Sequence, residues 1–82
     1  MTWQDHLTTD PGILGGKLVV RGTRLAVDFV LGLFAAGWTQ DQVFENYPQI
    51  SPEQLRAVFA YAAEVAQDEA VHVVSGVKRG AA

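Results

Sequence analysis

A short segment with two arginines carries the side chains best suited to bind an anion. Arg21 and Arg24 flank a Gly-Thr pair, so a tight turn there places two guanidinium groups beside a hydroxyl donor. Guanidinium groups bind phosphates and carboxylates through paired hydrogen bonds, so the segment fits a clamp for a phosphate or for a partner's carboxylate. An internal role is equally open, in which Arg24 pairs with Asp10 or Asp28 and ties the turn to the helix that follows.

The side chains that could support catalysis are few. His6 and His72 lie far apart in the sequence, and neither has a carboxylate at the spacing of a metal site or a proton relay. The chain has no cysteine, which excludes thiol chemistry. Lys17 ends a glycine-rich run, but a phosphate loop requires a helix directly after the lysine, and residues 18–20 are strand-like. We expect no enzymatic activity, no metal and no cofactor.

Length and composition fit one small domain over residues 1–82. Of the 82 residues, 49% are apolar and 18% are charged, which excludes an intrinsically disordered chain. A domain of this size buries only about 60–65% of the surface of its unfolded chain, so self-association is an expected source of further buried area. The longest apolar stretch, residues 29–38, is shorter than the ~20 residues that cross a membrane. We therefore expect a cytoplasmic protein.

Residues 1–26 contain the turn and strand signals. Glycines and a proline between residues 10 and 16 favour turns, because glycine reaches positive φ freely and proline fixes its own φ. Arg21-Gly22 suits a tight turn between two short runs. The predicted strands, two or three in number, are drawn from residues 3–7, 17–20 and 23–27.

Residues 27–70 predict three helices, which cover residues 27–36, 39–46 and 51–70. Gly37 supplies the left-handed stop of the first helix, and the apolar residues around Phe29 leave it almost no polar face, so we expect it to be buried on most sides. Thr39 and Ser51 begin the next two helices as N-caps, each with a glutamine three residues later.

The third helix carries an apolar stripe at helical spacing, and the segment after it alternates. The stripe runs through Leu55, Val58, Phe59 and Ala62. The helix is expected to fade near residue 70, followed by a short strand at 71–74 and a frayed tail. Together these elements predict an α+β, mainly α fold, in which a short N-terminal hairpin precedes a three-helix, homeodomain-like core.

The second and third predicted helices suggest a helix-turn-helix that could bind DNA. Arg21 and Arg24 are the candidate phosphate contacts, and Gln54 and Arg56 are the candidate base contacts. The net charge of −3 and the carboxylate of Glu53 at the start of the third helix oppose this hypothesis.

The large apolar side chains exceed what a three-helix core of this size requires. Core packing is the usual role of each, but the surplus favours a face that a second copy or a partner protein covers. We expect a dimer through the N-terminal strands and the first helix. The candidate interface residues are Trp3, Phe29, Leu33, Phe34 and Trp38.

An ordered set of short motifs resembles a known bacterial family. Residues 10–17 read DPGILGGK and lead to VRGTRL at 20–25, followed by AGWT at 36–39, ENYP at 45–48 and AYA at 60–62. Together they resemble the family called domain of unknown function 433, over roughly residues 3–70. Its motif often has proline where this chain has Leu18 and Ala26.

The resemblance implies a fold and a function. The fold is a homeodomain-like helical domain preceded by short strands, in which the family's glycines correspond to Gly15, Gly16 and Gly22, and its arginines to Arg21 and Arg24. The function is that of the antitoxin in a type II toxin–antitoxin pair, which binds a PIN-like ribonuclease toxin and its own operator DNA. The toxin is expected to contact the aromatic face or the tail from Val71 to Arg79.

Two other function classes stay open beside the antitoxin role. One is a dimerisation module that binds no DNA, and the other is a small hydrolase or ligand-binding protein that uses the glycine-rich turn.

Overall fold

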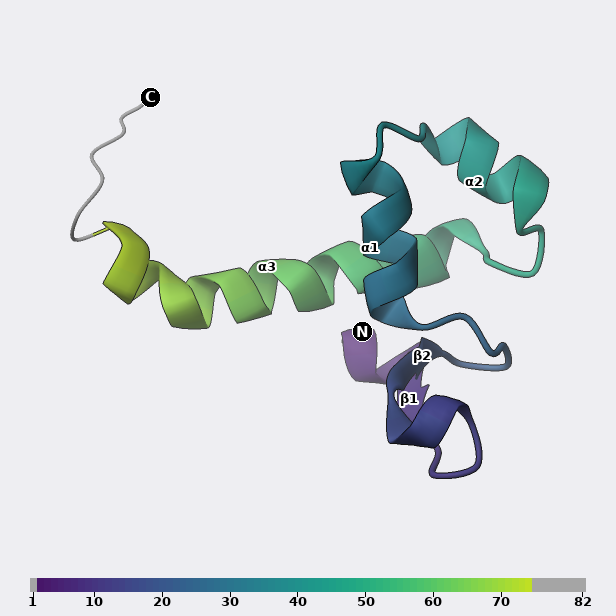
Figure 1. Ribbon diagram of the computed structural model, residues 1–82, viewed down its shortest axis with the longest axis horizontal. Helices are drawn as coiled ribbons and strands as arrows, with labels where there is room; N and C mark the ends of the chain where they lie inside the picture. Colours follow the sequence, from purple (N-terminus) through teal and green to yellow (C-terminus); the bar gives the residue numbers. More distant parts are fainter. Residues whose placement is uncertain (1, 75–82) are drawn as a thin grey trace.

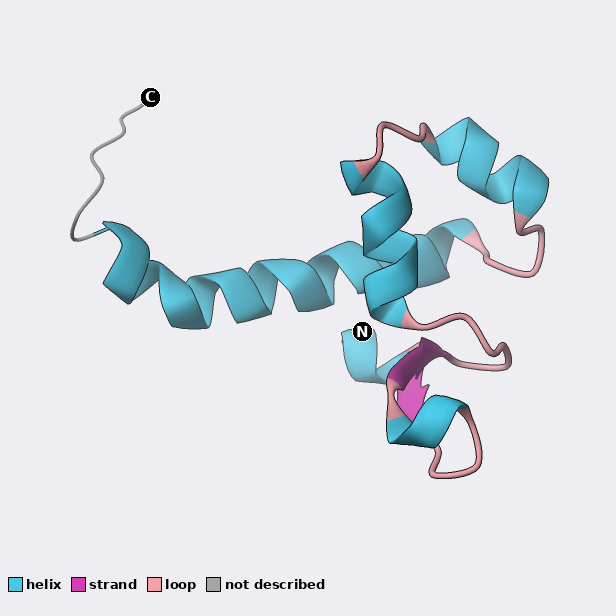
Figure 2. Ribbon diagram, in the orientation of Figure 1, coloured by secondary structure: helices cyan, strands magenta, loops and turns pink. Residues whose placement is uncertain are grey.

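The computed structural model describes residues 2–74, and the side chains through Asp68. A short antiparallel hairpin is followed by three helices, so the predicted α+β, mainly α architecture is confirmed (Figures 1 and 2). In chain order the elements are η1 (Trp3–Asp5), β1 (Leu7–Thr9), η2 (Leu14–Gly16), β2 (Leu18–Val20), α1 (Val27–Ala35), α2 (Gln40–Asn46) and α3 (Pro52–Val74).

The hairpin is smaller than the sequence predicted. β1 pairs with β2 with Leu7 opposite Val20 and Thr9 opposite Leu18. The strand expected at residues 3–7 is wrong, since Trp3–Asp5 form a 3-10 turn and pairing starts only at Leu7. A third strand at 23–27 is also wrong, because this segment contributes one isolated bridge and then begins α1.

The turn at Arg21-Gly22 is confirmed. Gly22 has a φ of +84°, a backbone conformation that a side chain would strain. The amide of Thr23 donates to the carbonyl of Val20 at 2.9 Å, and the Thr23 hydroxyl donates to the same carbonyl at 2.8 Å. The turn therefore fixes where β2 ends and where the chain enters α1.

α1 begins at Val27 as predicted and ends at Ala35, one residue before the predicted end, but it lacks the predicted burial. Gly37 follows the helix with a φ of +99°, which is the left-handed stop the sequence indicated. Of the helix, only Val27 and Val30 are fully buried, whereas Phe29 is 44% exposed. The expectation of burial on most sides is wrong, because Asp28, Phe29, Gly32 and Ala35 are all exposed. The helix contacts α3 and β2 (Figure 1).

Both predicted capping boxes are confirmed. At α2, the Thr39 hydroxyl accepts from the Gln42 amide at 3.1 Å, and the Gln42 side chain accepts from the Thr39 amide at 2.8 Å. At α3, Ser51 and Gln54 make the same pair of bonds at 3.1 and 3.0 Å. The amides in the first turn of a helix have no carbonyl partner within the helix. These side chains accept from such amides and so fix where each helix starts.

α3 is longer than predicted. The helix continues to Val74, so both its expected end near residue 70 and the expected strand at 71–74 are wrong. Nothing between residues 63 and 74 is a glycine or a proline, so the backbone meets no stop signal there. The expected frayed tail from Ser75 onward lies outside the described residues.

The core is small and built mainly from valine. The fully buried side chains of largest volume are Val19, Val20, Val27, Val30, Val43 and Val58. None of the aromatic side chains in the described part of the chain belongs to the fully buried set. The rings pack around the valine core instead, each with part of its surface open.

No helix within residues 2–74 is both long enough and apolar enough to cross a membrane.

Candidate protein-binding surface

Arg21 is held by the protein backbone. Its guanidinium donates to the carbonyl oxygens of Gln4 and Asp5, both at 3.1 Å, which ties the turn to η1. Its own carbonyl accepts from the Gln54 side chain at 3.1 Å. Of the two alternatives for the arginine pair, Arg21 thus has an internal role, although with partners that sequence spacing does not reveal.

Arg24 is exposed and pairs with neither of its expected partners. Asp10 accepts from the amide of Gly12 at 2.8 Å, and Asp28 forms an ion pair with Lys17 at 2.8 Å. The hydrogen bond and the charge of Lys17 lower the pKa of the Asp28 carboxyl below its usual value. Arg24 instead borders an open groove of about 400 Å³ on the hairpin, together with Thr8 and Thr23.

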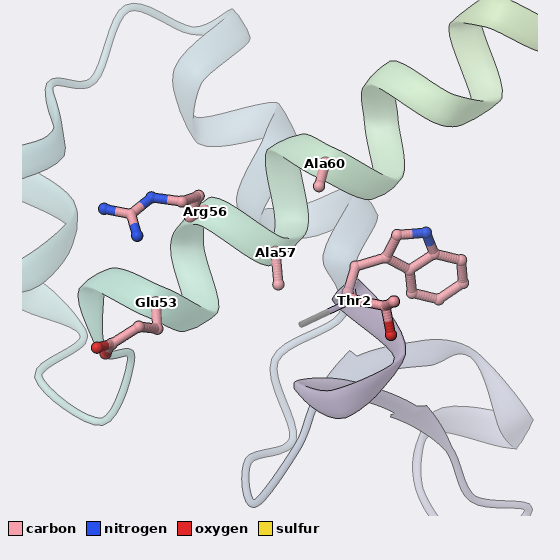
Figure 3. A pocket seen from close by; sticks show the side chains of 6 residues that line it. Thr2, Glu53, Arg56, Ala57 and Ala60 are labelled. Atoms are coloured by element: carbon pink, nitrogen blue, oxygen red, sulfur yellow. The ribbon is translucent and has the colours of Figure 1, made fainter.

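The helix-turn-helix face is only partly free. The Gln54 side chain is engaged at both ends, since its oxygen accepts from Ser51 and its nitrogen donates to Arg21. Arg56 is exposed and borders a pocket of about 260 Å³. In Figure 3, Arg56 and Glu53 project on one side of Ala57, and Thr2 lies on the other. The DNA contacts stay a prediction, with one of the two base-reading candidates already bonded.

The aromatic residues expected to form one interface take part in three different sets of ring contacts. Trp3 packs edge-on against Tyr61, with ring centroids 5.0 Å apart, and its indole donates to Glu64. Phe34 packs edge-on against Phe59, with ring centroids 5.0 Å apart. A third group contains the rings of Phe29 and Trp38. The remaining candidate, Leu33, is half-buried against the core.

The third group forms a surface that we call the aromatic ridge, defined by Phe29, Trp38 and Tyr47. Tyr47 lies between the other two, 5.8 Å from the Phe29 ring and 6.3 Å from the Trp38 ring. Phe29 is 44% exposed and the other two rings are half-buried. Sequence reasoning missed Tyr47, although its place before Pro48, where α2 ends, positions it.

A second exposed feature is the C-terminal end of α3, residues 65–74, which we call the arm. Figure 1 shows it extending away from the other elements. The arm side chains that the structure describes, Val65 to Asp68, are all exposed, and Val65 is 38% exposed. Just before the arm, the bond from Trp3 to Glu64 links α3 to η1.

In the described part of the chain, no group of three or more His, Asp or Glu side chains is placed to hold a metal ion. His6 is half-buried beside the hairpin, and the side chain of His72 lies outside the described part. Lys17 leads directly into β2, as the sequence predicted, so the glycine-rich run is a strand connection and lacks the helix of a phosphate loop.

The structure is a small domain of three helices preceded by a hairpin. Comparisons with known proteins identify its family. Residues 7–62 match the family model "Protein of unknown function (DUF433)", and the chain belongs to this family. A crystal structure of a DUF433 member protein from Anabaena variabilis ATCC 29413 has the same fold. It aligns with a TM-score of 0.71 at 24% identity, over 87% of this chain and 70% of that one.

A curated relative is much longer than this chain. The protein y4eO of Sinorhizobium fredii (strain NBRC 101917 / NGR234), described as uncharacterized, is 41% identical over 59 residues. These residues are 72% of this chain but 27% of y4eO. This chain therefore spans about a quarter of the length of that relative.

Proposed function

We propose that this protein is a non-catalytic docking module, the antitoxin of a type II pair, and that it binds a PIN-like ribonuclease through the aromatic ridge. The observation that carries the proposal is the ridge itself. Its three rings come from α1 and from the two ends of α2, the Tyr47 ring lies near both of the others, and Phe29 stays 44% exposed. Aromatic rings in this state provide large contact areas at low cost in conformational entropy, which is why they are enriched in protein interfaces.

The length of y4eO supports a docking role. In that protein the matching segment is 27% of the chain, so a domain of this kind is covalently joined to other polypeptide there. A docking surface on such a domain is therefore in reach of other protein segments there.

The DNA-binding part of the antitoxin hypothesis has less support than the protein-binding part. Arg21 and Gln54 form hydrogen bonds within the fold. The carboxylate of Glu53 lines the same pocket as Arg56 and opposes the approach of a phosphate. With a net charge of −3, the chain lacks the broad basic surface that phosphate binding requires. We therefore propose protein binding as the primary role, with no base contact from Gln54.

Co-expression with the PIN-like ribonuclease from the native host tests the proposal. We expect the two proteins to co-purify, and Phe29→Glu to abolish co-purification and restore ribonuclease activity. Leu14→Glu is the matched control, because Leu14 is also exposed, at 48%, but lies in the hairpin loop. Co-purification of Phe29→Glu at the wild-type level would contradict the assignment of the ridge, and failure of the wild type to bind would contradict the antitoxin role.

An operator-shift assay over a salt series tests the DNA alternative separately. The proposal predicts no retardation of the operator by the protein alone. Retardation that weakens steeply with salt would instead show phosphate contacts. Arg24→Ala would then be the informative variant, because Arg24 has no ion pair with the described side chains.

A further inference from the structure

The aromatic ridge carries two hydrogen-bond donors that have no acceptor among the described residues. One is the indole N–H of Trp38 and the other is the hydroxyl of Tyr47, and the centroids of these two rings lie 6.3 Å apart. The other tryptophan provides the contrast, because the indole of Trp3 donates to Glu64. One indole therefore links two elements of the fold, whereas the one on the ridge is available to another molecule.

Docking at the ridge removes water from both donors. The side chains of Trp38 and Tyr47 are half-buried in the chain alone, and a protein that covers them excludes solvent from the rest of their surface. A donor that loses its hydrogen bonds to water without gaining an acceptor is unfavourable, so buried Trp and Tyr side chains usually have a partner. Indole is a donor only, so the docked protein has to supply the acceptor.

The charges on the elements of the ridge are all negative. Residues 25–55 include four acidic side chains and no lysine, arginine or histidine. Asp28 is neutralised by its ion pair with Lys17, but Asp41 and Glu45, both exposed on α2, have no ion pair with the described side chains. Two uncompensated carboxylates therefore belong to the helix that joins two of the rings.

These carboxylates decide which acceptors fit. α2 is only about 10 Å long and runs between Trp38 and Tyr47, so Asp41 and Glu45 both lie within reach of the ridge electrostatically. A carboxylate brought to the two donors would be repelled by both acidic side chains, whereas a carbonyl oxygen carries no net charge. The favoured acceptors are therefore neutral.

We infer that the protein docked at the ridge presents neutral carbonyl oxygens, from its main chain or from Asn and Gln side chains, to Trp38 and Tyr47. These two donors then determine specificity, because a competitor with the same apolar surface but without these acceptors leaves both donors unpaired. Phe29, at 44% exposure, adds contact area without such discrimination. The inference rests on the proposed docking at the ridge and adds which groups the docked protein must carry.

Isothermal titration calorimetry with the purified PIN-like ribonuclease from the native host tests the inference. Tyr47→Phe removes the hydroxyl and keeps the ring, so it should raise the dissociation constant about threefold to tenfold. Trp38→Phe removes the indole donor together with part of the ring and should raise the constant by more than about tenfold. Tyr47→Phe should leave the thermal unfolding temperature unchanged, because its hydroxyl has no hydrogen bond within the described part of the chain.

Tyr61→Phe is the matched control. It removes the same hydroxyl from a ring that packs against Trp3, outside the ridge, and should leave the dissociation constant unchanged. Wild-type affinity in both Tyr47→Phe and Trp38→Phe, with binding lost in Phe29→Glu, would overturn the inference and leave the proposed function standing. Absence of binding by the wild type would contradict the proposed function, and the inference with it.

Neutralising the two carboxylates of α2 tests the choice of acceptor. The double variant Asp41→Asn, Glu45→Gln should bind no more tightly than the wild type, because neutral carbonyl oxygens are not repelled. Glu53→Gln with Asp68→Asn makes the same change of net charge on α3 and is the control. Binding that becomes about threefold tighter in the first double variant but not in the second would show that the acceptors are carboxylates, which would overturn the inference.

Discussion

The two ends of α3 have the same backbone conformation but are stabilised in different ways. The first part starts at a capping box, buries Leu55 and Val58 in the core, and is linked to the hairpin turn by Gln54. The described side chains of the arm, which follow Glu64, are all exposed and bury no comparable surface. Among the described side chains, those of α3 that enter the core therefore lie in its first part.

Truncating one apolar side chain in the first part of α3 and one in the arm should give the largest difference in the free energy of unfolding. Leu55→Ala should lower the free energy of unfolding by about 3 kcal/mol, because the fully buried side chain leaves a cavity. Val65→Ala should lower it by less than about 0.5 kcal/mol, because this side chain is 38% exposed. Urea unfolding followed by circular dichroism measures both values. Equal losses for the two variants would mean that the arm is part of the cooperative core.

Removing the cap of α3 should have the next largest effect. Ser51→Ala removes the acceptor for the Gln54 amide and should cost about 1 kcal/mol of stability. Ser51→Asp is the control, since aspartate caps helices equally well. A loss of the same size in Ser51→Asp would show that the hydroxyl is needed for something other than capping.

Arg21 and Arg24 also differ in how much they stabilise the fold, and the expected difference is smaller. Arg21→Ala should cost about 1 kcal/mol, because two hydrogen bonds to η1 are lost from an exposed site. Arg24→Ala should change the unfolding free energy by no more than about 0.5 kcal/mol. Thermal unfolding of both variants measures the difference. A stability loss at Arg24 that exceeds the loss at Arg21 would contradict the internal role assigned to Arg21.

The smallest effect concerns the pH dependence of the ion pair between Lys17 and Asp28. Because the pKa of Asp28 is lowered in the folded protein, its ion pair with Lys17 stabilises the fold above the usual pKa of the carboxyl. That contribution disappears as the pH falls through the lowered pKa. An NMR titration should show the pKa of Asp28 rising toward its usual value in Lys17→Met. An unchanged titration would mean that Lys17 does not cause the shift.

The features that the sequence predicted correctly depend on neighbouring residues. The capping glutamines lie three residues after Thr39 and Ser51, and Gly37 ends α1 by its own conformation, so each signal is complete within a few positions. The hairpin turn at Gly22 is of the same kind.

The errors and omissions arise from contacts over longer distances or from ambiguous local patterns. The alternation at 71–74 resembles a strand, but a helix that is already formed continues through β-branched residues when nothing stops it. The bonds from Arg21 to η1 and from Gln54 to Arg21 join segments 16 to 33 residues apart. Sequence spacing could not reveal them, and for the same reason it could not separate the aromatic residues into three groups.

Amide hydrogen exchange along α3 tests the central claim most directly. The account predicts that amides around Leu55 and Val58 are strongly protected, because these side chains are buried in the core. Amides of residues 65–68, whose side chains are exposed, should exchange much faster. Equal protection in the two parts of the helix would contradict the claim that the core contacts of α3 lie in its first part.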